Sequence, residues 1–442
     1  MSASLELGLA PERLDEGSPE ERAAFGVFTI RSSEQYLTEG FDCFLNSLRP
    51  GPLVSGYHVA QWFAWNWWRL RWEPRSAVEG WPFAHRMNTI GEGYVWPNID
   101  IWSDGVRTML ISSPSVKPDS KPFRYSGAFP TIVPSSQFEG ALDEFLPRIM
   151  GRLRSEGVAE TNLDRLWRDV LAERADPELT KRRRLEALMG RDPDAVDDDA
   201  VETLVRDANR LGEDAVREVA AEHGRAISGD KTVLTAQVLE DIAREVGFRA
   251  SPGDAVVLST RDQLPDPADV PGWVLGRAAA VAVREQEKLG EKQVPDQRLA
   301  QLVGTTPDAL INDPRKEVPL SYALDETAGH DSRVVLLSHY KTGRRFALAR
   351  LLGDRLMYPD GALHAATQAY TYRQKAQRSF AAEFLAPFDA VEDMLQGDYS
   401  EEKQQEVSEY FAVSPMVIDT LLKNHKRIER DQSDEDLYPK YA

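Results

Sequence analysis

Residues 344–387 contain the side chains whose types and spacing bear most directly on chemistry. Arg350 and Asp354 stand one helical turn apart, a spacing at which helix side chains meet and at which metal ligands can be paired. An arginine keeps its proton at working pH and carries only N–H donors, so Arg350 and Arg373 are suited to ion pairs rather than to metal coordination. At this spacing Arg350 and Asp354 could form an ion pair, worth about a few tenths of a kcal/mol if exposed.

Two apolar helices are expected to position these side chains. The first is predicted by apolar residues at helical spacing, namely Phe346, Leu348, Ala349, Leu352 and Leu356. This pattern leaves Arg344, Arg345 and Asp354 for a more solvent-exposed face. The second helix is predicted to bury Ala376, Phe380, Ala381, Phe384 and Leu385 and to stop at Pro387.

These two segments resemble the ImmA/IrrE-type zinc metallopeptidases. The first metal-binding helix of that family typically has the sequence Arg-Arg-Phe-Thr-Leu-Ala-His-Glu-Leu-Gly-His, and this chain matches it at Arg345-Phe346-Ala347-Leu348-Ala349 and Leu352-Gly353. The next helix of the family carries a glutamate ligand just before Ala-Asn-x-Phe-Ala-Ala-x-Leu-Leu-Met-Pro. The matching residues here are Ala376, Phe380, Ala381, Ala382, Leu385 and Pro387.

The resemblance implies a zincin-like fold that lacks its metal site. Position by position, Arg350 replaces the first histidine, Leu351 the glutamate that activates water, Asp354 the second histidine and Arg373 the third ligand. The similar region covers about residues 272–428, including a predicted helix at 276–284, a second at 294–304 and a strand at 334–338 followed by a turn at 341–343. We expect no catalytic residue, metal or cofactor here.

Other histidines offer no obvious replacement site. His330, His339 and His364 lie nearby in sequence, but none of them stands one helical turn from another histidine. His364 falls in a helix-like segment without acidic neighbours in the sequence. These residues are therefore interpreted as incidental histidines rather than ligands.

Active members of the family cut regulator or repressor proteins, often in mobile elements and in stress or phage responses. The resemblance therefore favours a non-catalytic protein-binding or regulatory role, in a phage-defence, toxin–antitoxin or mobile-element assembly with an unknown partner protein. One alternative is a DNA-binding regulator that uses the C-terminal residues 400–427, whose pattern predicts helix–turn–helix. The other alternative is an enzyme whose site lies in the unrecognised N-terminal half.

Composition limits the remaining classes. The chain has 442 residues, 53 basic against 72 acidic, which gives a formal charge of −19. That charge argues against non-specific adhesion to nucleic acid or membrane. No run of eighteen apolar residues and no signal-peptide pattern occurs, so we expect a cytoplasmic protein that does not span a membrane. The single cysteine, Cys43, excludes an intrachain disulfide and is expected to be buried and inert.

The fold class expected from these patterns is α+β with several domains. The predicted divisions are a tryptophan-rich α+β domain (1–130), a helical region (131–248), a linker (249–271), the mostly helical pseudo-peptidase domain (272–430) and an acidic tail (431–442). Residues 1–24 are polar and acidic and predict a loose arm or a poorly packed first helix. A strand is predicted at 25–31, a hairpin at 94–111, and a helix at 58–72.

Eight of the ten tryptophans lie between Trp62 and Trp102. In a helix that is apolar on nearly every side, such residues favour a dense aromatic core. The alternative is a partner-binding surface formed by Trp62, Trp65, Trp68 and Trp72, since tryptophan is enriched at interface hot spots. A metal or nuclease cluster of His85, Glu92, Asp100 and Asp104 is not favoured, because Trp102 stands where such a nuclease places a lysine.

Nucleic-acid contact is possible at two basic clusters but is not favoured. The first is Lys181, Arg182, Arg183 and Arg184, which an acidic stretch at 192–199 follows closely, so a self-paired or solvated face is preferred. The second closes the C-terminal pattern with Lys423, Lys426 and Arg427, which are within reach of phosphates if the last helix reads DNA. Packing of this segment on the preceding domain is the preferred interpretation.

Overall fold

The computed structural model describes residues 4–116, 121–195, 199–225, 233–311, 317–325 and 332–429. These residues form a mixed α/β protein with two compact units and several small sheets, which confirms the α+β, multidomain prediction at this level. Unit 1 comprises residues 4–195 with 224–225, and unit 2 comprises 199–223 and 233–429. The predicted helical region 131–248 is thus divided between the two units. His330 and the acidic segment 431–436 lie outside the described residues.

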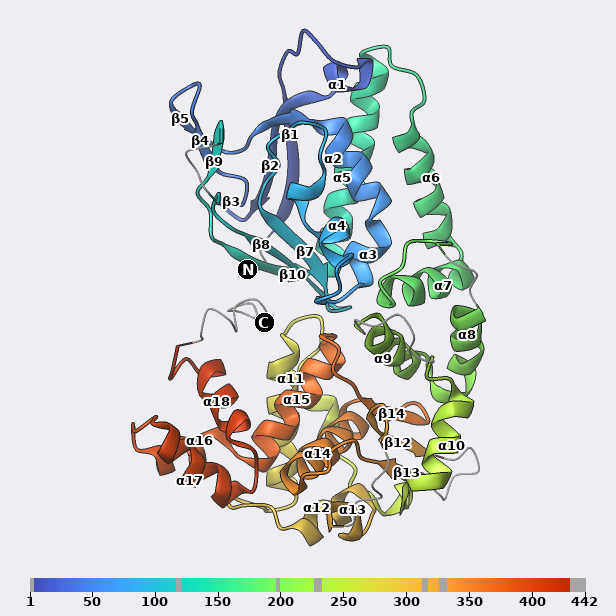
Figure 1. Cartoon of the computed structure of the whole chain (residues 1–442), viewed down its shortest axis with the longest axis vertical. Helices are drawn as coiled ribbons and strands as arrows, with labels where there is room; N and C mark the ends of the chain where they lie inside the picture. The colour runs from blue at the N-terminus through green and yellow to red at the C-terminus, as the bar shows by residue number, and fades with distance from the viewer. Residues whose placement is uncertain are drawn as a thin grey trace. The chain divides into compact units, whose positions relative to one another are not determined.

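Unit 1 contains three of the sheets, seen in Figure 1. Its strands are β1 (Leu5–Pro11), β2 (Phe25–Ser32), β3 (Gln35–Tyr36), β4 (Gly40–Asp42), β5 (Ser47–Arg49), β6 (Leu53–Ser55), β7 (Ile99–Ser103), β8 (Arg107–Ser112), β9 (Phe123–Tyr125) and β10 (Pro130–Pro134). Its helices are α1 (Pro19–Ala23), α2 (Gly56–Trp65), α3 (Trp67–Trp72), α4 (Trp81–His85), α5 (Ser135–Ser155), α6 (Asn162–Ala175) and α7 (Pro177–Leu188).

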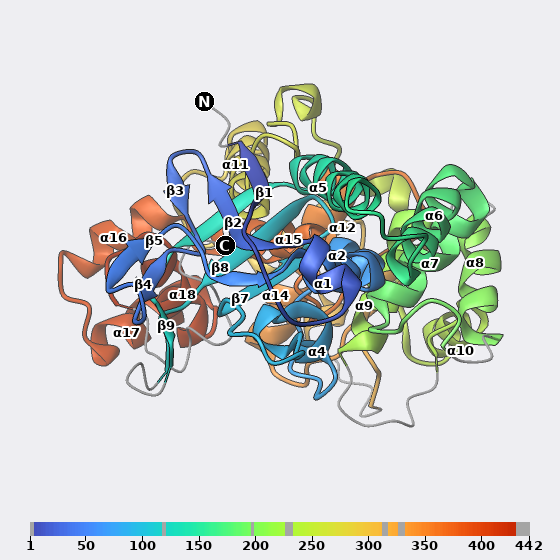
Figure 2. The same cartoon turned by 90° about the horizontal axis from the view of Figure 1, so that it is seen from above.

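The first strand corrects the prediction of a loose N-terminal arm. β1 pairs antiparallel with β2 along its whole length, from Leu5 opposite Ser32 to Pro11 opposite Gly26. β1, β2 and β3 lie side by side in Figure 2. Leu5 and Leu7 are buried, and the alternation of leucine with other residues at this end is the period-two signal of a half-buried strand. The acidic composition of residues 12–24 obscured this short pattern.

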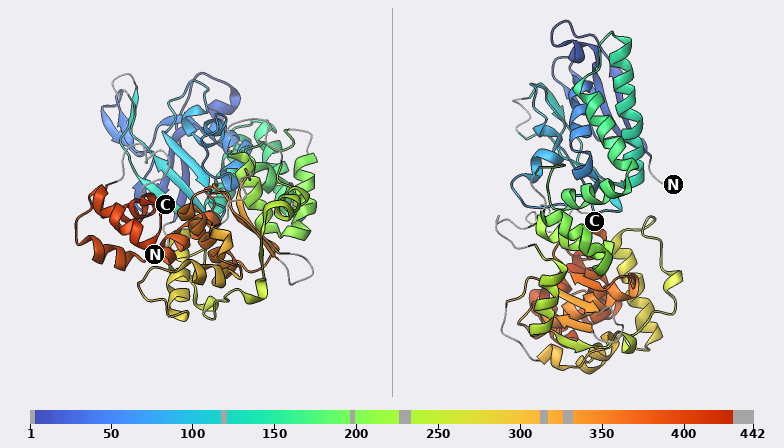
Figure 3. Two further views of the ribbon diagram at one scale, coloured as in Figure 1. Left: turned by 60° about the horizontal axis from the view of Figure 1, so that its bottom comes forward. Right: turned by 90° about the vertical axis from the view of Figure 1, so that its right-hand side faces the viewer.

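The core of unit 1 lies between this sheet and helices α2 and α5, and Figure 3 shows the long green α5 running along the blue strands. The ring of Phe145 meets that of Phe28 edge-on, with centroids 5.9 Å apart. α5 packs through an apolar stripe whose members are all buried: Phe138, Leu142, Phe145, Ile149 and Leu153. Such a stripe exists because side chains three and four residues apart share one helix face.

The predicted helix at 58–72 is two helices, α2 and α3, which meet at Asn66. The side-chain amide of Asn66 donates to the carbonyl of Trp62 at 2.9 Å, and this local bond competes with regular helix geometry. The predicted strand and hairpin are confirmed as β2 and as the antiparallel pair β7–β8.

Unit 2 is mostly helical around one four-stranded antiparallel sheet in the order β11-β13-β12-β14. Its strands are β11 (Phe248–Ala250), β12 (Ser321–Asp325), β13 (Ser332–Val335) and β14 (Leu363–Ala366). Its helices are α8 (Asp199–Leu211), α9 (Glu213–Gly224, of which Gly224 falls in unit 1), α10 (Ala236–Val246), α11 (Gly272–Gln286), α12 (Asp296–Val303), α13 (Asp308–Ile311), α14 (Lys341–Met357), α15 (Tyr372–Leu385), α16 (Phe388–Leu395), α17 (Glu401–Phe411) and α18 (Pro415–Asn424).

Glycines allow three helices of unit 2 to approach one another closely. A Cβ atom at Gly276 of α11 would lie 2.1 Å from the carbonyl oxygen of Ala376 on α15. A Cβ atom at Gly353 of α14 would lie 2.4 Å from the ring of Phe380, also on α15. Only glycine avoids both overlaps, so α11 and α14 can pack directly against α15.

Two arginines at the start of α14 are buried, although the sequence pattern placed them on a more solvent-exposed face. Arg344 and Arg345 are fully buried, and residues 341–343, predicted to be a turn, form the first turn of α14. The guanidinium of Arg344 donates two hydrogen bonds to the carbonyl of Ala309, at 2.9 and 2.6 Å. Arg345 pairs with Asp296 and donates to the carbonyls of Val294 and Ala412. These acceptors compensate the buried charges, so the two arginines fasten α14 to the surrounding segments.

Candidate functional site: a buried polar network around Asp354

Asp354 lies at the centre of a polar network buried inside unit 2. α14 supplies Asp354 and Arg350, and α15 supplies Arg373, Gln374 and Gln377. All five side chains are buried. Positions 350, 354 and 373, which are separated by up to 23 residues, therefore converge on one place in the fold.

Each of the two carboxylate oxygens of Asp354 is bonded to two side chains. Oδ1 accepts from Arg373 Nε at 2.6 Å and from Gln377 Nε2 at 2.6 Å. Oδ2 accepts from Arg373 Nη2 at 2.5 Å and lies 2.9 Å from Nδ1 of His364. Burial by itself raises the pKa of Asp354, but Arg373 and His364 outweigh burial and hold the pKa well below its usual range.

The ion pair that the sequence allowed between Arg350 and Asp354 is not formed, because Arg373 pairs with the carboxylate of Asp354. Arg350 instead donates through Nη2 to the carbonyl of Thr367 at 2.6 Å and to Oε1 of Gln374 at 2.5 Å. Burial lowers the pKa of Arg350 to about 9, so its guanidinium remains charged at neutral pH. Gln374 Oε1 also accepts the backbone N–H of Thr367, which ties α14 and α15 to the chain that follows β14.

His364 also differs from its prediction in two respects. It lies in strand β14 rather than in a helix, and it contacts the carboxylate of Asp354, an acidic neighbour that the local sequence does not provide. The antiparallel pairing of β14 with β12 brings the strand beside α14, so the contact depends on tertiary structure. The alanines after His364 favoured a helix in the sequence, whereas the segment forms a strand in which every residue is buried.

The donors of this network cannot form a zinc site of the usual kind. Zinc needs unprotonated nitrogen, sulfur or oxygen ligands, whereas Arg350 and Arg373, at two positions that the resemblance aligns with ligands, carry only N–H donors. The carboxylate of Asp354 is fully engaged by its four donors. Among the residues that the structure describes, no three His, Cys, Asp or Glu side chains are grouped to hold a metal ion.

The four tryptophans considered for partner binding differ in exposure. Trp62 and Trp68 are buried in the aromatic core, and Trp68 Nε1 donates to Glu173 at 2.6 Å. Trp72 is half-buried, with the guanidiniums of Arg71 and Arg184 at 3.9 and 4.0 Å from its ring. Trp65, which is 56% exposed, presents its ring to solvent.

The first basic cluster is largely self-paired. Arg183 is buried and contacts Glu173, Glu186 and Asp194. Arg182 pairs with Glu186, and Lys181 pairs with Glu178. Arg184 lies against Trp72, as noted above. Three of the four basic side chains of this cluster, Lys181, Arg182 and Arg183, thus lie against carboxylates.

The predicted helix–turn–helix at the C-terminus is confirmed as α17 and α18, with Ala412 in a left-handed conformation (φ 51°) between them. Lys423 pairs with Asp419 at 2.9 Å. Arg427 pairs with Glu392, and Lys426 is exposed but takes part in an interaction of its own. Acidic neighbours therefore offset part of the charge that contact with phosphates would need.

Two of the residues considered as a metal or nuclease cluster, His85 and Asp104, make separate structural contacts. His85 lies 2.7 Å from the carbonyl of Ile101 and 2.9 Å from Glu73, and its ring stacks on Trp81. Asp104 Oδ1 accepts the backbone N–H groups of Val106 and Arg107, which shapes the turn between β7 and β8. Cys43, expected to be buried, is partly exposed.

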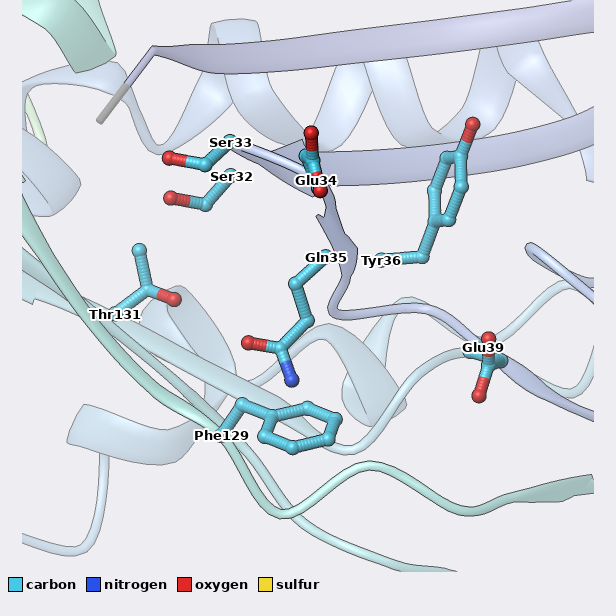
Figure 4. Close-up of a pocket in the computed structure, with 8 residues that line it drawn as sticks. All are labelled: Ser32, Ser33, Glu34, Gln35, Tyr36, Glu39, Phe129 and Thr131. Atoms are coloured by element: carbon cyan, nitrogen blue, oxygen red, sulfur yellow. The ribbon is translucent and has the colours of Figure 1, made fainter.

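A shallow polar hollow of about 460 Å³ lies in unit 1 between the β2–β3 hairpin and β10 (Figure 4). Its lining comprises Ser32, Ser33, Glu34, Gln35, Tyr36, Glu39, Phe129 and Thr131. β10 is an edge strand of its sheet, but it is poorly suited to pair with a peptide strand from a partner. Phe129 and Ser135 bond toward β8, so Pro130 and Pro134 face the free edge, where they offer no N–H.

Comparison with known proteins gives no relative: no family model, no curated protein and no solved structure matches this chain. Among the described residues, no helix has the length and apolar character needed to cross a membrane.

Proposed function

We propose that unit 2 is a degenerate ImmA/IrrE-like, zincin-like domain that has lost catalysis, and that the protein is a non-catalytic protein-binding or regulatory component. A phage-defence, toxin–antitoxin or mobile-element assembly is the setting that the resemblance favours. The observation that carries the proposal is the convergence of positions 350, 354 and 373. Ligand positions of one metal site must meet in space, and here they meet with a salt bridge between Asp354 and Arg373.

The replacements are consistent with a domain that kept its framework when the metal was lost. A buried metal ion organises its ligands and stabilises the folded state. In this chain, the pairing of Asp354 with Arg373 and the bonds from Gln374 and Gln377 hold α14, α15 and β14 together instead. Leu351, at the position of the general base, is buried and cannot activate water.

Metal analysis of the purified full-length chain tests this proposal. We expect less than a tenth of an equivalent of zinc per chain, and no chelator-sensitive cleavage of a repressor protein. Stoichiometric zinc bound near position 350, or cleavage abolished by a chelator, overturns the proposal.

A ligand-restoring variant tests the fold assignment itself. The combined substitutions Arg350→His, Leu351→Glu, Asp354→His and Arg373→Glu place the family's ligand set at the converging positions. We expect this variant to retain one zinc per chain after dialysis. A matched variant with alanine at the same four positions is the control. Equal zinc content in both variants means that the four positions do not form a zincin-like site.

A further inference from the structure

The turn between β4 and β5, together with β5 itself, presents three large apolar side chains to solvent. Phe44 is 85% exposed, Leu45 59% and Leu48 61%, and these three residues form the hairpin patch. Figure 1 shows β4, β5 and β9 at one side of unit 1, away from its helices. Soluble proteins often expose single apolar side chains, but a cluster of large ones marks a binding surface.

The register of the small sheet explains why Leu48 is exposed. Leu48 pairs with Phe41 of β4, and Phe41 pairs with Arg124 of β9, so these three side chains share one face of the sheet. The opposite face carries Phe123 and Tyr125, which are buried. The inner face therefore packs on unit 1, whereas the outer face carries the exposed side chain of Leu48.

Asp42 fixes the turn that carries the other two side chains of the patch. Its Oδ1 accepts the backbone N–H groups of Phe44 and Leu45, at 3.0 and 3.1 Å. The carboxylate of Asp42 is buried, and its Oδ2 lies 3.5 Å from Nη1 of Arg49. Asn46 completes the turn in the left-handed conformation that asparagine tolerates, with φ 51°. A turn held in one conformation loses little conformational entropy when a partner binds, so the patch is preorganised.

The charge of this small sheet is opposite to that of the whole chain. Segments 40–49 and 121–125 contain three basic residues and one acidic residue, whereas the chain carries a formal charge of −19. Lys121 is exposed and stands next to the turn, because its carbonyl accepts from the thiol of Cys43 at 3.5 Å. The hairpin patch is therefore an apolar surface with a basic rim on an acidic protein.

This charge distinguishes between the occupants that an apolar patch can have. A second copy docked through the same face would bring two basic rims together, which is unfavourable. An anionic membrane surface repels a chain whose formal charge is −19. An acidic segment that also carries large apolar side chains complements both the patch and its rim.

We propose that the hairpin patch binds an acidic segment of a partner protein. The apolar side chains of that segment cover Phe44, Leu45 and Leu48, and its carboxylates lie near Lys121. This inference goes beyond the proposed function, because it assigns a partner surface to unit 1 and does not depend on whether unit 2 binds a metal. The zinc measurement on the full-length chain decides the proposed function separately, so either conclusion can fail while the other stands.

Site-specific photo-crosslinking of the full-length chain, in the cells that produce it, tests the inference. The substitution Leu45→p-benzoylphenylalanine keeps an apolar side chain at an exposed position, so the Tm should stay within about 2 °C of the wild type. Mass spectrometry of the cross-linked peptides should identify a segment of another protein in which Asp or Glu adjoins large apolar residues.

The same photoreactive residue at Glu144, an exposed position of α5, is the matched control. It should give an about tenfold lower yield of cross-linked partner. Equal yields at the two positions overturn the inference, as does the absence of a cross-link at position 45. A cross-link to a second copy of this chain, to a lipid or to a segment without acidic residues overturns it as well.

A charge variant separates recognition of an acidic segment from general apolar adhesion. The probe is a synthetic peptide with the sequence of the cross-linked segment, titrated into the purified full-length chain. Lys121→Glu should raise the Kd about threefold to tenfold. Lys292→Glu changes the net charge equally at an exposed position of unit 2 and should leave the Kd unchanged. An unchanged Kd for Lys121→Glu, or an equal rise in both variants, overturns the assignment to an acidic partner.

Discussion

Arg373 and Asp354 form a two-point salt bridge in which Nε and Nη2 of the arginine donate to the two carboxylate oxygens, at 2.6 and 2.5 Å. Both side chains are buried, and the bridge joins α15 to α14. A buried pair of this kind is costly to break, because the remaining charge is left without compensation. The bridge therefore contributes to holding α14 and α15 together, the role that the proposed function assigns to a metal ion in the family.

Substitution of Arg373 by methionine should destabilise unit 2 strongly. The buried carboxylate of Asp354 loses its cation, a loss that costs about 3–5 kcal/mol and lowers the Tm by about 10 °C. Calorimetry of the full-length chain measures the change. The matched double variant, Arg373→Met with Asp354→Leu, removes both charges. Its free energy of unfolding should fall by less than that of the single variant. A double variant that is less stable than the single one contradicts the assignment of the cost to an unpaired charge.

Gly276→Ala should also destabilise unit 2, through a different cause. The added Cβ atom would lie 2.1 Å from the carbonyl oxygen of Ala376, so α11 and α15 must separate. Overpacking of this kind costs about 1–3 kcal/mol. Gly140→Ala in α5 is the control, because nothing lies within 4 Å of its Cβ position. An alanine in this helix interior should raise the free energy of unfolding by about 0.5–1 kcal/mol. The Tm should therefore fall for Gly276→Ala and rise for Gly140→Ala.

His425 should make stability depend on pH in mildly acidic solution. Its ring stacks on Phe388 with centroids 3.4 Å apart, and burial, assisted by Arg277, lowers its pKa from 6.5 to about 4. Between pH 6.5 and about 4, His425 binds a proton in the unfolded chain but not in the folded chain. Stability is therefore full above pH 6.5 and falls as the pH drops toward 4.

The variant His425→Phe keeps an aromatic ring against Phe388 and removes the titration. Its Tm should fall less steeply than that of the wild type between pH 6.5 and 4, while the two curves run parallel between pH 6.5 and 8. Identical slopes throughout the acidic range would show that His425 does not titrate with the lowered pKa.

Periodicity in the sequence was sufficient to predict the helices that carry the network. Spacings of three and four residues located α14 and α15, and the residues aligned with family ligands at 350, 354 and 373 proved to converge. What the sequence did not indicate was the choice of partners within the cluster. Arg350 is one turn from Asp354, but Arg373 from a different helix reaches the carboxylate with better two-point geometry.

Burial of charge was the main feature that local patterns could not predict. Arg344 and Arg345 occupy positions that a hydrophobic pattern assigns to solvent, yet carbonyls and a carboxylate from distant segments compensate them. His364 was assigned to a helix because alanines follow it, but β12 recruits the segment into the sheet. In each case a long-range contact overrides the local preference.

The tryptophans of α2 and α3 should separate into structural and surface residues when they are substituted. Trp68 is buried and donates to Glu173, so Trp68→Ala should cost about 3–5 kcal/mol. Because the ring of Trp65 is exposed, Trp65→Ala should lower the free energy of unfolding by less than about 0.5 kcal/mol. Thermal unfolding of the two variants measures this difference. If Trp65 belongs to a partner-binding surface, Trp65→Ala should weaken association with a partner protein at unchanged Tm, whereas equal losses of stability in both variants would place Trp65 in the core.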